Sequence, residues 1–206
     1  MTDRTRILAL VAALGVAYFG STILLLSLLT ADYNPITQAA SDYGVGRFAL
    51  EMNLGFLIGG IGLVSLALAL FLQRTGPTSR VRSILLVIAG LVLVMDAYFN
   101  YEPRRGSSHL ARNNSRFWRL IFFITAPIGM LLVFRRFGRS KFLTTLVALI
   151  IGFLFLVANA VLSLNAGGLA ERILLLVVFS SAIAASLTLF RISTDTGSST
   201  LGPVSP

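Results

Sequence analysis

The chain has 206 residues, of which 56% are hydrophobic and only 12% are charged, and its mean hydropathy is +0.86. A soluble domain carries about 25% charged residues, so this composition excludes an ordinary soluble protein and indicates one whose solvent is mostly lipid. The net charge of +9 comes from basic residues that form no dense run. We therefore expect no nucleic acid partner and instead expect contact with anionic membrane lipids. The lack of cysteine excludes disulfides, thiolate metal sites and a cysteine nucleophile.

Six apolar runs follow one another, each of about the length that an α-helix needs to cross a bilayer. The first is too long for the apolar core of a signal peptide, so we expect it to remain as a helix. None of the runs alternates with the period of two that a membrane β-barrel requires. We predict an all-α fold, a membrane-embedded bundle of six transmembrane helices with short loops in one domain (1–191), followed by a flexible polar tail (192–206). The spans cover about 7–30, 53–73, 81–100, 117–134, 142–164 and 169–190.

The charges of the loops predict the orientation of this bundle. The side that holds both termini carries ten basic and two acidic residues, whereas the other side carries seven basic and six acidic residues. Cytoplasmic loops of membrane proteins are rich in lysine and arginine. We therefore expect a multi-pass protein of the cell membrane with its N- and C-termini in the cytoplasm.

Polar residues that could bind a ligand gather toward the outer ends of the expected helices and in two outer loops. Asp96 and Asn100 are four residues apart, so they share one face of the third helix. Such polar groups at one depth predict a polar pocket that opens outward, although helix ends that reach the head groups would give the same pattern. The predicted pocket residues are Ser41, Asp42, Asp96, Asn100, Glu102, His109, Arg112 and Asn159.

Three glycines, Gly55, Gly59 and Gly62, lie on one face of the second expected helix. Small residues at this spacing allow two membrane helices to approach closely. The pattern favours packing inside the bundle over formation of a homodimer, and both interpretations remain open.

The sequence offers little support for metal or enzyme chemistry. It has a single histidine, His109, placed in the loop between the third and fourth spans, and no cysteine. Zinc sites need several such ligands, so we expect no metal and no cofactor. A serine hydrolase could be assembled from Ser41 or Ser108 with His109 and Asp96, but this combination has no diagnostic spacing. The sequence therefore favours a non-enzymatic protein.

Short motifs over most of the chain, about 7–191, resemble the Domain of Unknown Function 998 family of multi-pass membrane proteins. They are Asn34-Pro35-Ile36, the stretch 40–44 (Ala-Ser-Asp-Tyr-Gly), the stretch 53–56 (Asn-Leu-Gly-Phe), Tyr101-Glu102-Pro103 with His109 after it, and Glu171-Arg172-Ile173. Ala40 stands where the family usually has isoleucine, and only an acid before Pro103 remains of its Pro-x-Asp-Pro element. The resemblance implies a multi-helix membrane protein and implies no activity.

Three functions are compatible with these features. The first is a binding or transport-like membrane protein whose outward pocket holds a lipid head group or a small polar ligand. The second is a membrane hydrolase or transferase that acts on a lipid-linked substrate, with His109 or paired carboxylates as acid–base groups. The third is a structural or assembly subunit with a membrane-protein partner. The outer polar residues favour the first.

Overall fold

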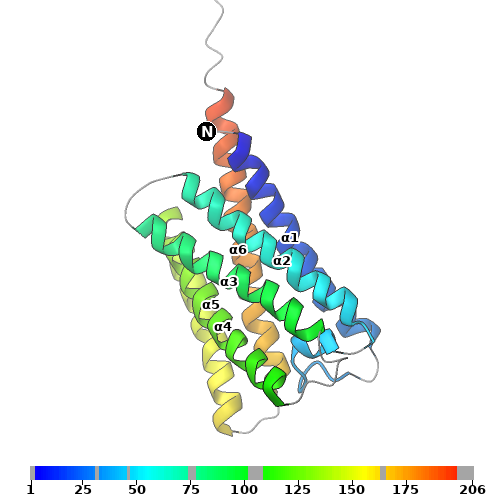
Figure 1. The fold of residues 1–206 in the computed structure, drawn as a ribbon. Coiled ribbons are helices and arrows are strands. Elements are labelled where there is room, and N and C mark those ends of the chain that lie inside the picture. Colours follow the sequence, from blue (N-terminus) through cyan, green and yellow to red (C-terminus); the bar gives the residue numbers. More distant parts are fainter. Residues whose placement is uncertain are drawn as a thin grey trace, which may run out of the picture.

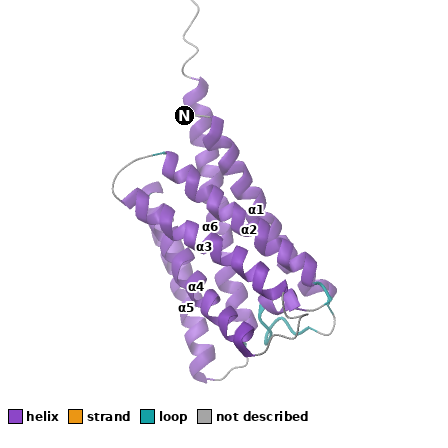
Figure 2. Ribbon diagram, in the orientation of Figure 1, coloured by secondary structure: helices purple, strands orange, loops and turns teal. Residues whose placement is uncertain are grey.

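A computed structural model places six long α-helices and one short 3₁₀ helix. It describes residues 3–30, 33–45, 47–73, 78–101, 109–162 and 166–198, with side chains for all of these except 45, 99–101, 109–117, 119, 160–162 and 193–198. Within these residues there is no strand, which confirms the predicted all-α fold (Figure 2). The elements are α1 (Asp3–Leu29), η1 (Ala40–Val45), α2 (Ala49–Leu72), α3 (Thr78–Tyr101), α4 (His109–Phe137), α5 (Arg139–Leu162) and α6 (Gly167–Ser198).

Every helix begins before the apolar run that predicted it, and α3, α4 and α6 also end after theirs. At 24 to 32 residues, they are about 36–48 Å long at 1.5 Å per residue, which exceeds the roughly 30 Å hydrocarbon core. Hydropathy locates only the part of a helix that lies in lipid, whereas the polar flanks continue the same helix into the head groups. His109, expected in a loop, is accordingly the first residue of α4. The polar tail expected from residue 192 is helical as far as Ser198.

Consecutive helices run antiparallel, so α1 begins where α6 ends (Figure 1). We call this the terminal end, and we call the opposite end, where α1 finishes, η1 lies and α6 begins, the loop end. The strongest helix contacts are α1 with α2 and α6, and α3 with α2 and α4, while α5 packs on α4 and α6. Gly138 alone links α4 to α5, with a positive φ of 124° that only glycine adopts easily.

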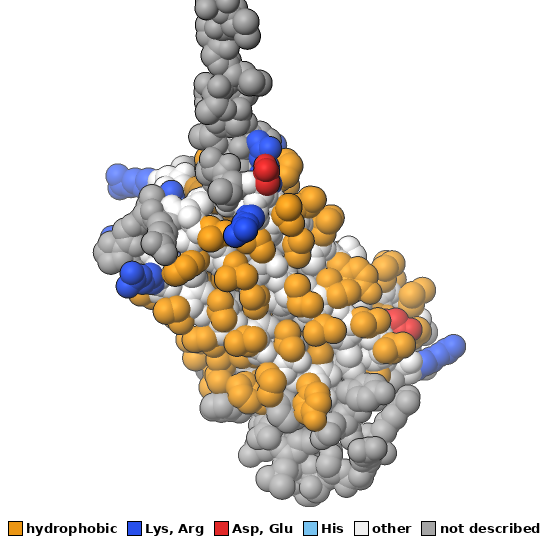
Figure 3. All heavy atoms as spheres, turned by 45° about the horizontal axis from the view of Figure 1, so that its top comes forward, with side chains coloured by type: hydrophobic (Ala, Val, Ile, Leu, Met, Phe, Trp, Pro, Cys, Tyr) orange, Lys and Arg blue, Asp and Glu red, His pale blue; other side chains and the backbone are white. Residues whose placement is uncertain are grey.

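The exterior of the bundle matches a bilayer. Each of the six helices contains a segment long and apolar enough to span a membrane, and many of the large apolar side chains on them are exposed. Hydrophobic side chains cover the middle of the face in Figure 3, and charged side chains lie toward its two ends. Since exposed leucine is favourable in lipid and unfavourable in water, the protein is a multi-pass membrane protein.

Small residues bring α2 close to both of its neighbours. The glycine face of α2 lies against α1, where Gly55 and Gly59 meet the ring of Phe19 and Gly62 meets the backbone of α1 around Gly15. On the opposite side, Gly60 faces Gly90 of α3. In lipid, such close backbone contact replaces the hydrophobic driving force that is absent between helices. The structure therefore places the glycine face inside the bundle.

Candidate functional site

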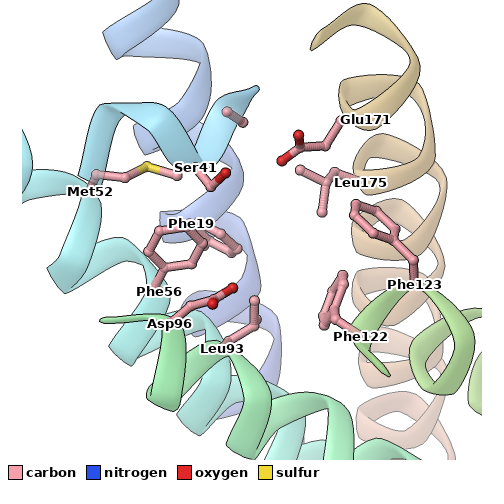
Figure 4. Close-up of a pocket in the computed structure, with 11 residues that line it drawn as sticks. Phe19, Ser41, Met52, Phe56, Leu93, Asp96, Phe122, Phe123, Glu171 and Leu175 are labelled. Atoms are coloured by element: carbon pink, nitrogen blue, oxygen red, sulfur yellow. The ribbon is translucent and has the colours of Figure 1, made fainter. Parts of the chain in front are cut away.

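The predicted pocket region contains a cavity at the loop end, between η1, α1, α2, α3, α4 and α6 (Figure 4). Three oxygen-bearing side chains, Ser41, Asp96 and Glu171, line it. The rest of its wall is apolar and largely aromatic: Phe19, Ala40, Met52, Phe56, Leu93, Phe122, Phe123 and Leu175. Its volume is about 20 Å³, which is room for about one water molecule. The cavity can hold one small polar group, and it is too small for a whole lipid head group.

Ser41 and Asp96 are both predicted pocket residues, and the structure brings them together. Ser41 lies on η1 and is 6% exposed, and its Oγ has no hydrogen-bond partner. Asp96 lies near the loop end of α3 and is 3% exposed. Figure 4 shows the carboxylate of Asp96 pointing into the space between the two aromatic walls. A buried hydroxyl without a partner is costly, so Ser41 is poised to bond to a group placed in the cavity.

Glu171 is the pocket residue that was not predicted. It lies in the first turns of α6, and its carboxylate points across the cavity toward Ser41 in Figure 4. The sequence does contain a signal for this position. Leu175, Val178 and Ala182 are buried on the inner face of α6, and Glu171 continues their helical spacing toward the loop end. The helical period of the sixth span therefore places Glu171 inside the bundle.

Asp42, by contrast, lies outside the cavity and has a local structural role. Its side chain is exposed, and its Oδ2 accepts a hydrogen bond of 3.0 Å from the backbone N–H of Ala39. In return, the N–H of Asp42 donates to the carbonyl of Ala39. The first bond is one half of a capping box and the second is the ordinary backbone bond of a 3₁₀ turn, so Asp42 stabilises the start of η1.

Asn159 also lies away from the cavity, in the last turns of α5. Its Oδ1 accepts a hydrogen bond of 2.6 Å from the N–H of Ala166, the residue before α6. The remaining predicted pocket residues fall on parts that the structure does not describe: the side chains of Asn100, His109 and Arg112, and the whole of Glu102.

Replacing Asn159 with alanine is expected to destabilise the protein by about 1 kcal/mol, because the N–H of Ala166 loses its acceptor. Denaturant unfolding of the purified protein measures the change. Asn159→Asp retains the acceptor oxygen and is expected to lose less. The control is Thr144→Ala, which removes an exposed hydroxyl bond within the same helix. Equal stability of Asn159→Ala and the control would contradict this role.

Arg172 holds the loop between α1 and α2 in place beside the cavity. Its Nη1 donates to the carbonyls of Pro35 at 2.7 Å, Gln38 at 2.9 Å and Gly168 at 3.0 Å. The N–H of Leu169 also donates to the carbonyl of Ile36 at 3.0 Å. The start of α6 thus holds the loop at several backbone points.

Two tyrosines of this loop cover the guanidinium of Arg172. The rings of Tyr33 and Tyr43 stack with centroids 3.9 Å apart, and Arg172 lies 5.6 Å and 5.9 Å from them. This geometry gives cation–π attraction. Burial raises the pKa of Tyr33 far above its ordinary value, against the opposing effect of Arg172. Tyr33 therefore stays protonated and keeps its hydrogen bond to the carbonyl of Ala39. We call Arg172 and residues 33–43 the loop clamp.

A larger groove of about 450 Å³ lies on the other side of α6, between α6 and α1. Most of its lining is apolar, with hydroxyls at Ser21, Ser27 and Ser180 and the Arg172 side chain toward the loop end. Leu175 lines both this groove and the small cavity. The groove has the size and character of a site for an acyl chain.

The comparisons with known proteins add a family and no activity. The model of a family described as "Protein of unknown function (DUF998)" matches residues 11–188. No curated protein and no solved structure matches the chain. The geometry of the site must therefore carry the functional argument.

Proposed function

The chain belongs to the DUF998 family of proteins of unknown function, and we propose that it binds a membrane lipid or small ligand through a primary ammonium group held in the cavity at the loop end. The observation that carries this proposal is the set of three oxygen-bearing side chains, Ser41, Asp96 and Glu171, around a space the size of one water molecule. An ammonium group has that size and three hydrogen-bond donors.

Charge and aromatic surroundings support a cationic group over an anionic one. Asp96 and Glu171 are carboxylates, and the cavity has no basic residue among its described lining residues. Phenylalanine rings such as Phe122 and Phe123 favour a nearby cation through their π faces. The unpartnered Oγ of Ser41 supplies a further acceptor. A quaternary ammonium group, which has no N–H donor and is several times larger, fits this cavity poorly.

The groove between α1 and α6 supports a lipid as the bearer of that group. Its lining includes the exposed side chains of Leu24 and Leu176, and it reaches Leu169 and Arg172 near the start of α6. Because Leu175 separates it from the cavity by a single side chain, an acyl chain in the groove would leave its head group level with the cavity. A phosphatidylethanolamine-like lipid combines both parts.

The proposal includes an orientation in the cell membrane with both termini in the cytoplasm, so that the cavity belongs to the outer leaflet. Its support is the basic terminal end, where Arg4, Arg80, Arg135, Arg139 and Lys141 carry exposed side chains. Positive residues favour the cytoplasmic side of a bilayer.

The test compares the melting temperature of the purified protein in phosphatidylcholine nanodiscs with and without phosphatidylethanolamine. We expect phosphatidylethanolamine to raise the melting temperature of the wild type. Ser41→Ala and Asp96→Asn should weaken apparent binding about tenfold or more, since a hydrogen bond to a charged group contributes roughly 1.5–3 kcal/mol.

Glu51→Gln is the matched control, because Glu51 is an exposed acid at the same end of the bundle. It should respond to phosphatidylethanolamine as the wild type does. If phosphatidylethanolamine stabilises the Ser41 and Asp96 variants as much as the wild type, the cavity is not the binding site.

A further inference from the structure

The terminal end of the bundle contains a buried arginine whose charge is not neutralised by any carboxylate that the structure describes. Arg82 lies in the second turn of α3 and is 2% exposed. Its Nε and Nη2 have no hydrogen-bond partner. These two donors form the side of a guanidinium that binds a carboxylate or phosphate in a bidentate manner. Burial of such a group without an acceptor is strongly unfavourable, so the position calls for an anionic occupant.

The groups around Arg82 are donors and cations. Arg136, from the end of α4, is the charged neighbour that acts on Arg82. It donates from Nη1 to Oε1 of Gln73 at 3.4 Å. The Nε2 of Gln73 is buried and has no hydrogen-bond partner. All of these groups can donate hydrogen bonds, and two of them are positively charged.

A cavity of about 420 Å³ opens at this end, and two of the same residues line it. Its lining consists of Gln73, Arg136, Phe137, Lys141, Thr188 and Ile192. Arg82 is not itself a lining residue, but Arg136 lines the cavity and is the charged neighbour of Arg82, and Lys141 adds a further cation. Of the acidic side chains that the structure describes, Asp3 alone belongs to the terminal end, where it lies 4.0 Å from Arg6. No described carboxylate balances Arg82, Arg136 and Lys141.

We infer that the terminal end binds a phosphate group between α2, α3, α4 and α6, with Arg82 and Arg136 as its main ligands and Gln73 and Lys141 beside them. Phosphate offers several acceptor oxygens and a negative charge, which match unpartnered donors and uncompensated cations. The group can belong to a phospholipid of the adjacent leaflet or to a soluble phosphate compound. This site lies at the opposite end of the bundle from the proposed ammonium cavity and does not depend on it.

The experiment measures the melting temperature of the full chain in phosphatidylcholine nanodiscs in two arms. One arm titrates inorganic phosphate, and the other replaces part of the phosphatidylcholine with phosphatidic acid. We expect a rise in melting temperature in at least one arm. A rise in melting temperature with inorganic phosphate would show that a soluble phosphate is sufficient for binding. A rise with phosphatidic acid alone would show that the site binds the phosphate of a lipid head group.

Three variants test whether the rise in melting temperature depends on the proposed phosphate site. Arg136→Gln, at an exposed position, should raise the half-saturating concentration at least tenfold without loss of folding. Arg82→Met replaces the buried charge by an apolar chain of similar length, so it should remove the response while leaving the unliganded protein at least as stable. Arg47→Gln, an exposed arginine at the loop end, should respond as the wild type does. The inference is overturned if neither arm stabilises the wild type, or if the Arg136 and Arg82 variants respond as fully as Arg47→Gln.

Discussion

Replacing Gly60 with alanine is expected to destabilise the bundle by about 1–3 kcal/mol, the usual cost of adding a methyl group where packing is already tight. A methyl group at Gly60 would lie 2.6 Å from the carbonyl oxygen of Gly90 and 3.2 Å from the backbone nitrogen of Val94. Both obstacles are backbone atoms of α3, so no side-chain rotation can relieve the overlap. The helices must separate, and the contact between them is lost along several turns.

The opposite side of this contact gives an independent test. A methyl group at Gly90 would lie 2.7 Å from the carbonyl oxygen of Gly60, so Gly90→Ala should cost about as much as Gly60→Ala. The double variant should cost less than the sum, because the first substitution already separates the helices. Denaturant unfolding in detergent micelles measures all three free energies.

Gly20→Ala is the matched control, since Gly20 is also a glycine in the interior of a membrane helix. A methyl group there meets only the ring of Phe179, at an ordinary contact distance of 3.7 Å. Alanine favours the helix over glycine by up to about 1 kcal/mol. Gly20→Ala is therefore expected to be neutral or stabilising. Destabilisation by Gly20→Ala as large as that by Gly60→Ala would contradict the packing argument.

The helical bundle could be predicted from the sequence because its physical cause is local. A run such as 53–73 is almost entirely apolar, and the lipid interior accommodates a backbone only when its hydrogen bonds close within the helix or barrel. The glycine face of α2 could likewise be identified from spacing within one helix. The sequence did not reveal that α2 has a second contact, between Gly60 and Gly90, because that pairing depends on how α2 and α3 align.

The site was predicted only in part, since it depends on contacts between distant segments. Asp96 could be selected because polar residues are rare inside membrane spans, and Ser41 because it belongs to a loop at the same end of the predicted bundle. Arg172 bonds to carbonyls more than 130 residues away, and backbone carbonyls have no sequence signature. The sequence gives no signal that distinguishes Arg82 from its exposed basic neighbour Arg80. The helix that begins at Thr78 instead turns Arg82 inward.

Replacing Arg172 with methionine is expected to release the loop between α1 and α2 and to destabilise the protein by about 2–4 kcal/mol. Methionine fills much of the space but donates no hydrogen bond, so the carbonyls of Pro35 and Gln38 lose a charged donor, each such bond contributing roughly 1.5–3 kcal/mol. Tyr33 and Tyr43 lose their cationic partner as well. Hydrogen–deuterium exchange measures the release, and we expect it to be faster across residues 33–45 in the variant than in the wild type.

The conservative and control substitutions separate hydrogen bonding from charge. Arg172→Lys keeps the charge and some donors but loses the planar group that lies beside the two tyrosines, so its exchange should fall between those of wild type and Arg172→Met. Arg47→Met removes an exposed arginine that lies 5.6 Å from the ring of Phe48, and it should leave exchange in 33–45 unchanged. Wild-type exchange in Arg172→Met would show that the loop is held without Arg172. Since Ser41 belongs to the loop clamp and reaches the cavity from η1, release of the loop should also abolish the stabilisation by phosphatidylethanolamine.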